Sequence, residues 1–73
     1  MTRQIADALA NYAKVYKAYQ IAKGATFNID VATQFAVEGL YAQARHSPED
    51  QAVWWINDEA ACIQDALDKR AAA

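Results

Sequence analysis

The sequence predicts an all-α fold, a three-helix assembly that doubles into an antiparallel helical homodimer. Three observations lead to this fold class. Only two of the 73 residues are glycine and one is proline, so little in the chain interrupts a helix. Apolar residues recur every three or four positions, which is the spacing of one helix face. Capping and stop residues divide the single domain 1–73 into helices at about 2–23, 30–45 and 48–70.

The segment 2–23 carries one apolar seam. Its members are spaced four, three, four and three residues apart, and they are Ile5, Leu9, Tyr12, Tyr16 and Tyr19. Ala8 and Val15 widen this seam on one side. Gly24 is the expected left-handed stop, and we expect Phe27 in the following loop to fill the core at the corner.

The segment 30–45 is apolar or small around most of its circumference. Its polar residues share one narrow wedge of the helical wheel, and they are Gln34, Glu38 and Arg45. A helix of this kind is buried on more than one side, so we expect it to be the central helix. Asn28 or Asp30 is expected to cap its first turn, and Gly39 would let another helix approach closely.

The segment 48–70 has the clearest start signal. Ser47 offers a capping hydroxyl, Pro48 suits the first helical position, and two acids follow in the first turn. Its seam, spaced three, four, three and four, consists of Val53, Ile56, Ala60, Ile63 and Leu67. The two outer helices therefore have one seam each, while the middle helix has more apolar surface than one neighbour covers.

Length and charge narrow the function classes. A chain this short buries only about 60% of the surface that its unfolded form exposes. Small domains without disulfides or metals often oligomerise to make up the deficit, hence the predicted homodimer. The net charge of −2 gives no general attraction to nucleic acid or to a membrane. Residues 1–24 are basic and residues 47–73 acidic, so we expect these segments to lie side by side, in one chain or between two. The single cysteine and the lack of a secretory or membrane-spanning segment predict a cytoplasmic protein.

The residues that catalysis needs are missing or misplaced. His46 is the only histidine, and Cys62 lies too far along the last helix to meet it within one chain. The carboxylates follow no metal-ligand spacing, and the two glycines are too isolated to hold a phosphate. Acids on the last helix would repel DNA from it. We therefore expect no enzyme activity, cofactor, metal or sequence-specific nucleic-acid partner.

The tryptophans are the strongest candidates for a binding surface. Trp54 and Trp55 point about 100° apart on a helix, and neither belongs to the seam. The conservative interpretation is that one indole covers the core and the other lies at its edge. An exposed tryptophan commonly marks an interface, for which self-association is the first explanation and a foreign partner the second. Trp54 heads a face with Asp58 and Asp65, which suits a partner bearing Arg or Lys near an apolar pocket, although charged faces are ordinarily only solvated. Tyr12 and Tyr16 in the segment 2–23 are the remaining candidate binding residues.

Tyr12 and Tyr16 allow two interpretations. Tyrosines at helical spacing are more often core residues with hydroxyls at the rim than a recognition surface. With Lys17 they are also the residues that a small-ligand or nucleotide site between helices would use. We keep both as candidate binding residues.

Part of the last helix resembles a known family. The resemblance lies in Trp55-Ile56, Ala60-Ala61, Ile63, Asp65-Ala66-Leu67 and Arg70, which look like the C-terminal helix of small phage-encoded quorum-sensing anti-activators. That family consists of short helical dimers that inhibit host regulatory proteins. The resemblance implies a phage or mobile-element accessory protein, and it carries over no functional residue.

Together these observations predict a small helical protein–protein interaction protein, an inhibitor or adaptor that occludes a partner protein. A small-ligand or nucleotide-binding module and a structural oligomer subunit are the alternatives. A concave pocket near the tyrosines would favour the first alternative, and assembly beyond a dimer would favour the second.

Overall fold

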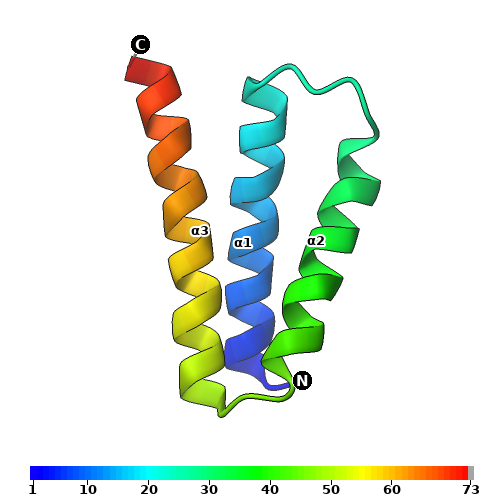
Figure 1. The fold of residues 1–73 in the computed structure, drawn as a ribbon, viewed down its shortest axis with the longest axis vertical. Coiled ribbons are helices and arrows are strands. Elements are labelled where there is room, and N and C mark those ends of the chain that lie inside the picture. Colours follow the sequence, from blue (N-terminus) through cyan, green and yellow to red (C-terminus); the bar gives the residue numbers. More distant parts are fainter. Residues whose placement is uncertain (73) are drawn as a thin grey trace.

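The computed structural model describes residues 1–72, which form three α-helices. They are α1 (Arg3–Ala22), α2 (Ile29–Ala44) and α3 (Glu49–Ala72). The chain reverses direction at each loop, so α1 and α3 are parallel and α2 is antiparallel to both (Figure 1). The predicted all-α, three-helix fold is confirmed, and each predicted helix end lies within two residues of the observed one.

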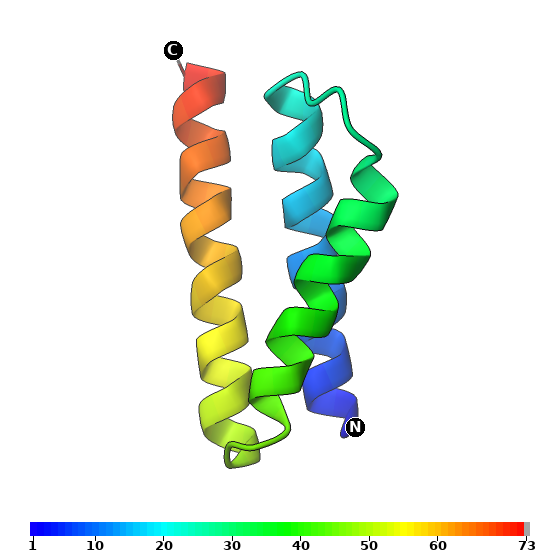
Figure 2. The same cartoon turned by 45° about the vertical axis from the view of Figure 1, so that its right-hand side comes forward.

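The helix in the middle is α1, so the expectation that residues 30–45 form the central helix is wrong. α1 packs against α3 along most of its length and against α2 over a smaller area, while α2 and α3 barely touch. Figures 1 and 2 show α2 and α3 close together only near the loop that joins them. The apolar circumference of α2 is real, but its own chain covers only one side of it.

The core forms where α1 meets α3, and α2 packs against it from Ala36 to Ala44. Its buried members are Ile5, Ala8, Leu9, Tyr12, Ala44, Ala52, Ile56 and Ala60. The seam predicted for α1 is buried at its first three positions, and the α3 seam is buried at Ile56 and Ala60. Val15 is buried beside them, as expected. The buried alanines are short, so α1 and α3 can approach closely.

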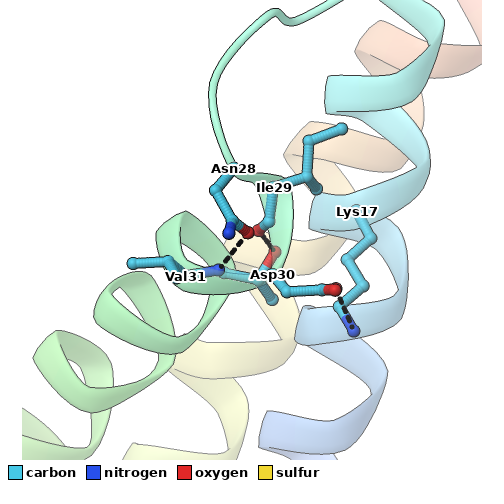
Figure 3. A network of polar contacts seen from close by, with 6 residues as sticks. Lys17, Asn28, Ile29, Asp30 and Val31 are labelled. Atoms are coloured by element: carbon cyan, nitrogen blue, oxygen red, sulfur yellow. Dashed lines mark hydrogen bonds and ion pairs between the residues drawn. The ribbon is translucent and has the colours of Figure 1, made fainter.

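Two of the three helix starts have side-chain caps. The Thr2 hydroxyl accepts a hydrogen bond from the Ile5 amide at 3.2 Å, and the Asn28 carboxamide accepts one from the Val31 amide at 3.1 Å (Figure 3). Asn28 is therefore the cap of α2, and Asp30 lies inside its first turn. Gly24 follows the C-cap residue of α1 and has φ of 73°, the left-handed conformation predicted for it.

Two local expectations are wrong. The first α-helical hydrogen bond of α3 joins the Ala52 amide to the Pro48 carbonyl, so proline occupies the cap position and Ser47 lies one residue outside. Phe27 does not fill the core, because 52% of its surface is exposed. The buried cluster lies towards the other end of the molecule, near the loop that joins α2 and α3, whereas Phe27 lies in the loop between α1 and α2 (Figure 1).

The basic and acidic segments lie side by side in one chain, as predicted, since α1 packs along α3. Their charges are not directly paired in the part of the chain that the structure describes. Lys17 instead contacts Asp30 at the start of α2, with 3.1 Å between the ammonium nitrogen and the carboxylate oxygen (Figure 3). The Arg70 guanidinium donates to the Ala22 carbonyl at 3.4 Å and links the ends of α3 and α1. None of the three helices is long and apolar enough to cross a membrane.

Candidate protein-binding surface

The outer face of α3 presents an exposed indole among acids. Trp54, Asp58, Ala61 and Asp65 follow one another three or four residues apart, on the side of the helix away from buried Ile56. We call these four residues the acidic tryptophan face. All four are exposed, and 69% of the Trp54 surface is open to solvent. Trp54 therefore contributes little to the core of its own chain.

The acids of this face differ in how they are engaged. The Asp65 carboxylate contacts the Lys69 ammonium one turn later at 3.1 Å, and both side chains are mostly exposed. Asp58, which lies between Trp54 and Asp65, makes no ion pair within residues 1–72. An exposed pair such as Asp65–Lys69 holds its partners weakly, so both carboxylates are available to an incoming cation.

Trp55 has a different environment from its neighbour. It is half-buried and packs against the core cluster. Trp55 therefore covers the core, as the conservative interpretation expects, whereas Trp54 lies outside the core and not at its edge. Between them the surface is hollowed by about 490 Å³ at the start of α3. The hollow is lined by Ser47, Asp50, Gln51, Ala52, Trp54 and Trp55.

The tyrosine candidates belong mainly to the interior. Only 7% of Tyr12 is exposed, and its ring lies 5.9 Å from the ring of Tyr16 between centroids. Burial raises the pKa of Tyr12 above its usual value of 10.0, and Tyr16 and Glu59 raise it further. Tyr16 is half-buried, and Lys17 is engaged with Asp30. Tyr12 is therefore not open to a partner, and the structure does not bring these residues together around the hollow beside Trp54.

A second exposed surface, apolar in character, lies on α2. Val31, Phe35, Gly39 and Ala42 are all exposed and lie along one side of the helix. We call them the α2 outer stripe. Figure 3 shows Val31 directed away from α1, whereas Lys17 and Asp30 meet on the α1 side. The apolar circumference of residues 30–45 predicts surface in excess of what one neighbour covers, but the sequence does not show which of these residues stay exposed.

Neither metal-binding side chains nor the comparisons with known proteins indicate a further site in residues 1–72. Within residues 1–72, no three His, Cys, Asp or Glu side chains gather closely enough to hold a metal ion. Cys62 is exposed and has no disulfide partner in the chain. No protein-family model matches the chain, and no curated protein or solved structure shows significant similarity to it. The likeness of α3 to phage anti-activators therefore stays a prediction.

Proposed function

We propose that this chain is a small homodimeric helical inhibitor or adaptor, of the phage or mobile-element accessory kind. It binds a partner protein through the acidic tryptophan face and occludes the surface that it covers. The observation that carries the proposal is the exposure of Trp54 on a helix face that has no packing role. No chemistry on the partner is involved, and the effect is steric.

The exposure of Trp54 gives the face its binding energy. An aromatic side chain buries on the order of 150–250 Å², so the 69% of Trp54 that is exposed leaves well over 100 Å² to cover. Covering that area would contribute roughly 3–4 kcal/mol at about 25 cal/mol per Å². A single residue with this potential is typical of an interface hot spot, where tryptophan is enriched.

The surroundings of Trp54 define the chemistry of the partner. Asp58 and Asp65 lie on one side of the indole, and Asp50 lines the hollow on the other. A partner helix or loop with an apolar side chain for the hollow and Arg or Lys at its rim would satisfy both features. Arginine fits best, because its guanidinium can stack on an indole while it binds a carboxylate. Supporting this choice, the net charge of the chain is negative.

The test compares variants of two exposed aromatic residues, Trp54 and Phe27. Wild type is immobilised, bound bacterial proteins are identified by mass spectrometry, and the dissociation constant of each purified protein is measured. We expect Trp54→Ala to weaken the functional partner about 30-fold or more, the effect of losing a hot spot of about 2 kcal/mol. The double variant Asp58→Asn, Asp65→Asn should weaken it too, and added salt should mask that second loss.

Phe27→Ala and Asp7→Asn are the matched controls. Phe27 is an aromatic residue that is 52% exposed in the loop between α1 and α2, and Asp7 is an exposed acid on α1, so both lie outside the proposed surface. Both variants should bind the partner as wild type does. If no captured protein loses affinity with Trp54→Ala while keeping it with Phe27→Ala, the acidic tryptophan face is not the binding surface.

A further inference from the structure

The α2 outer stripe combines a protruding ring with a gap one turn away. Phe35 is 69% exposed, and Val31 is 46% exposed on the same side of α2. Gly39 follows Phe35 by one turn, and a methyl group placed on its backbone would meet no atom within 4 Å. A glycine in the middle of a helix destabilises it by roughly 0.5–1 kcal/mol relative to alanine. Nothing within residues 1–72 makes use of the space that this glycine leaves.

The order of large and small residues along the stripe identifies what fits it. Phe35 and Gly39 are placed symmetrically about Val37, and Val31 and Ala42 are symmetric about nearly the same point. A second α2 packed antiparallel about a twofold axis at that level would set each Phe35 over the partner's Gly39 position. Each Val31 would then meet the small Ala42 of the other copy. A parallel pair would instead oppose ring to ring and gap to gap.

The backbone dipole of α2 favours the same arrangement. Its aligned peptide units leave partial positive charge at the start of the helix and partial negative charge at its end, and an antiparallel pair sets these opposite ends side by side. The charged side chains of α2 flank the stripe and do not form it. Asp30 lies on the α1 side and pairs with Lys17, and exposed Glu38 borders the stripe, where its carboxylate accepts a hydrogen bond from Gln34.

We infer that a second copy of this chain covers the α2 outer stripe, with the two α2 helices antiparallel and Phe35 of each seated over Gly39 of the other. The contact is isologous, so the same patch serves both copies and the assembly closes at two. α2 has 16 residues, a length of about 24 Å, and one helix pair lies at the small end of stable interfaces. We therefore expect a dissociation constant on the order of 1–100 µM. The inference specifies the homodimer within the proposed function but does not depend on the acidic tryptophan face.

The experiment exchanges ring and gap between the two positions. Sedimentation equilibrium is recorded from about 1 µM to 1 mM, a range that brackets this affinity, for wild type, Phe35→Ala, Gly39→Phe and the double variant. Wild type should show a monomer–dimer equilibrium. Each single variant should raise the dissociation constant of the dimer by about tenfold or more. The double variant should regain dimerisation, because a ring at 39 then faces alanine at 35. Circular dichroism of all four should be alike, since both positions are exposed and Gly39 has free space.

Mixing the two single variants gives the sharpest result. A Phe35→Ala copy beside a Gly39→Phe copy has one large and one small residue at both contacts, so a one-to-one heterodimer should form where neither variant dimerises alone. Trp54→Ala should leave dimerisation unchanged, which separates this surface from the one in the proposed function. A wild type that stays monomeric up to 1 mM, or a dimer indifferent to Gly39→Phe, would overturn the inference.

Discussion

Ile56 is the residue on which the packing of α1 against α3 depends most. It is the largest side chain that is fully buried, with none of its surface exposed. We predict that Ile56→Ala lowers the free energy of unfolding by about 2–5 kcal/mol, the range for truncating a buried aliphatic side chain. Urea denaturation followed by circular dichroism measures the change. Ile21→Ala makes the same truncation at a residue that is 66% exposed, and it should stay within about 0.5 kcal/mol of wild type. Equal losses from both would show that this core is wrongly placed.

Ionisation of the buried Tyr12 makes the stability of the fold depend on pH in the alkaline range. Its raised pKa means that the folded chain holds the phenolic proton more tightly than the unfolded chain does. Unfolding therefore releases this proton once the pH passes the unfolded value, and stability falls as the pH rises further. We predict that the stabilisation is complete below pH 10 and is lost progressively above it. Tyr12→Phe removes the titrating group, so its unfolding free energy should fall less steeply than that of wild type between about pH 9.5 and 11.5. Parallel curves for the two proteins would contradict the assignment.

At the scale of the helices, the two glycines have opposite roles. Gly24 has φ of 73°, which an L side chain adopts at a cost of about 1–2 kcal/mol, whereas Gly39 is helical and has free space around it. We predict that Gly24→Ala destabilises the fold by about 1 kcal/mol or more, and that Gly39→Ala stabilises it by up to about 1 kcal/mol. Both are measured by urea denaturation in the Phe35→Ala background, in which we expect the chain to be monomeric. The same sign for both substitutions would refute this account of the helix end or of the open space.

The helices themselves follow from local signals that need no tertiary information. Thr2, Asn28 and Gly24 mark ends that lie close to the observed ones, because capping is decided within a few residues of the chain. The identity of the central helix could not be predicted in the same way. Periodicity shows that residues 30–45 have apolar surface on several sides, but it does not show whether that surface is covered by the same chain or left open. Short alanines decide the matter here, since Ala8, Ala52 and Ala60 let α3 rather than α2 lie closest to α1.

The candidate site was predictable only in part for a related reason. The 100° between Trp54 and Trp55 showed that one of them had to leave the core, and the α3 seam gave the side on which the core lies. The burial of Tyr12 also follows from its place in the α1 seam. The exposure of Phe35 could not be predicted, because its neighbours on α2 are also apolar and the hydropathy pattern does not distinguish its side of the helix. The exposure of such a residue appears only when the neighbouring helices are placed.

At the scale of the whole molecule, the two proposed surfaces lie on helices at opposite edges. α1 separates α2 from α3 over most of their length, and the outer sides of α2 and α3 face away from it (Figure 1). A dimer formed through α2 would therefore leave the acidic tryptophan face of each copy free at its two ends. Such a dimer could hold two partner molecules, or two sites on one dimeric partner, and the second contact would gain from its effective concentration. This arrangement suits an inhibitor of a regulator that is itself dimeric.

The open arrangement also predicts how the molecule comes apart. α2 contacts α1 over a limited area and α3 scarcely at all, so α2 should open at a lower free energy than the α1–α3 pair. Hydrogen exchange followed by mass spectrometry reads each helix separately. In dilute wild type and in Gly39→Phe, the amides of α2 should exchange faster than those of α1 and α3.

Raising the wild-type concentration to about 100 times the dissociation constant should protect α2 by up to about 2.7 kcal/mol, because a partner that binds only the closed form stabilises it by mass action. Gly39→Phe should show no such change at the same concentrations. If all three helices exchange together at every concentration, the weak attachment of α2 is contradicted. If raising the concentration protects only α3, the second copy binds α3 and not α2.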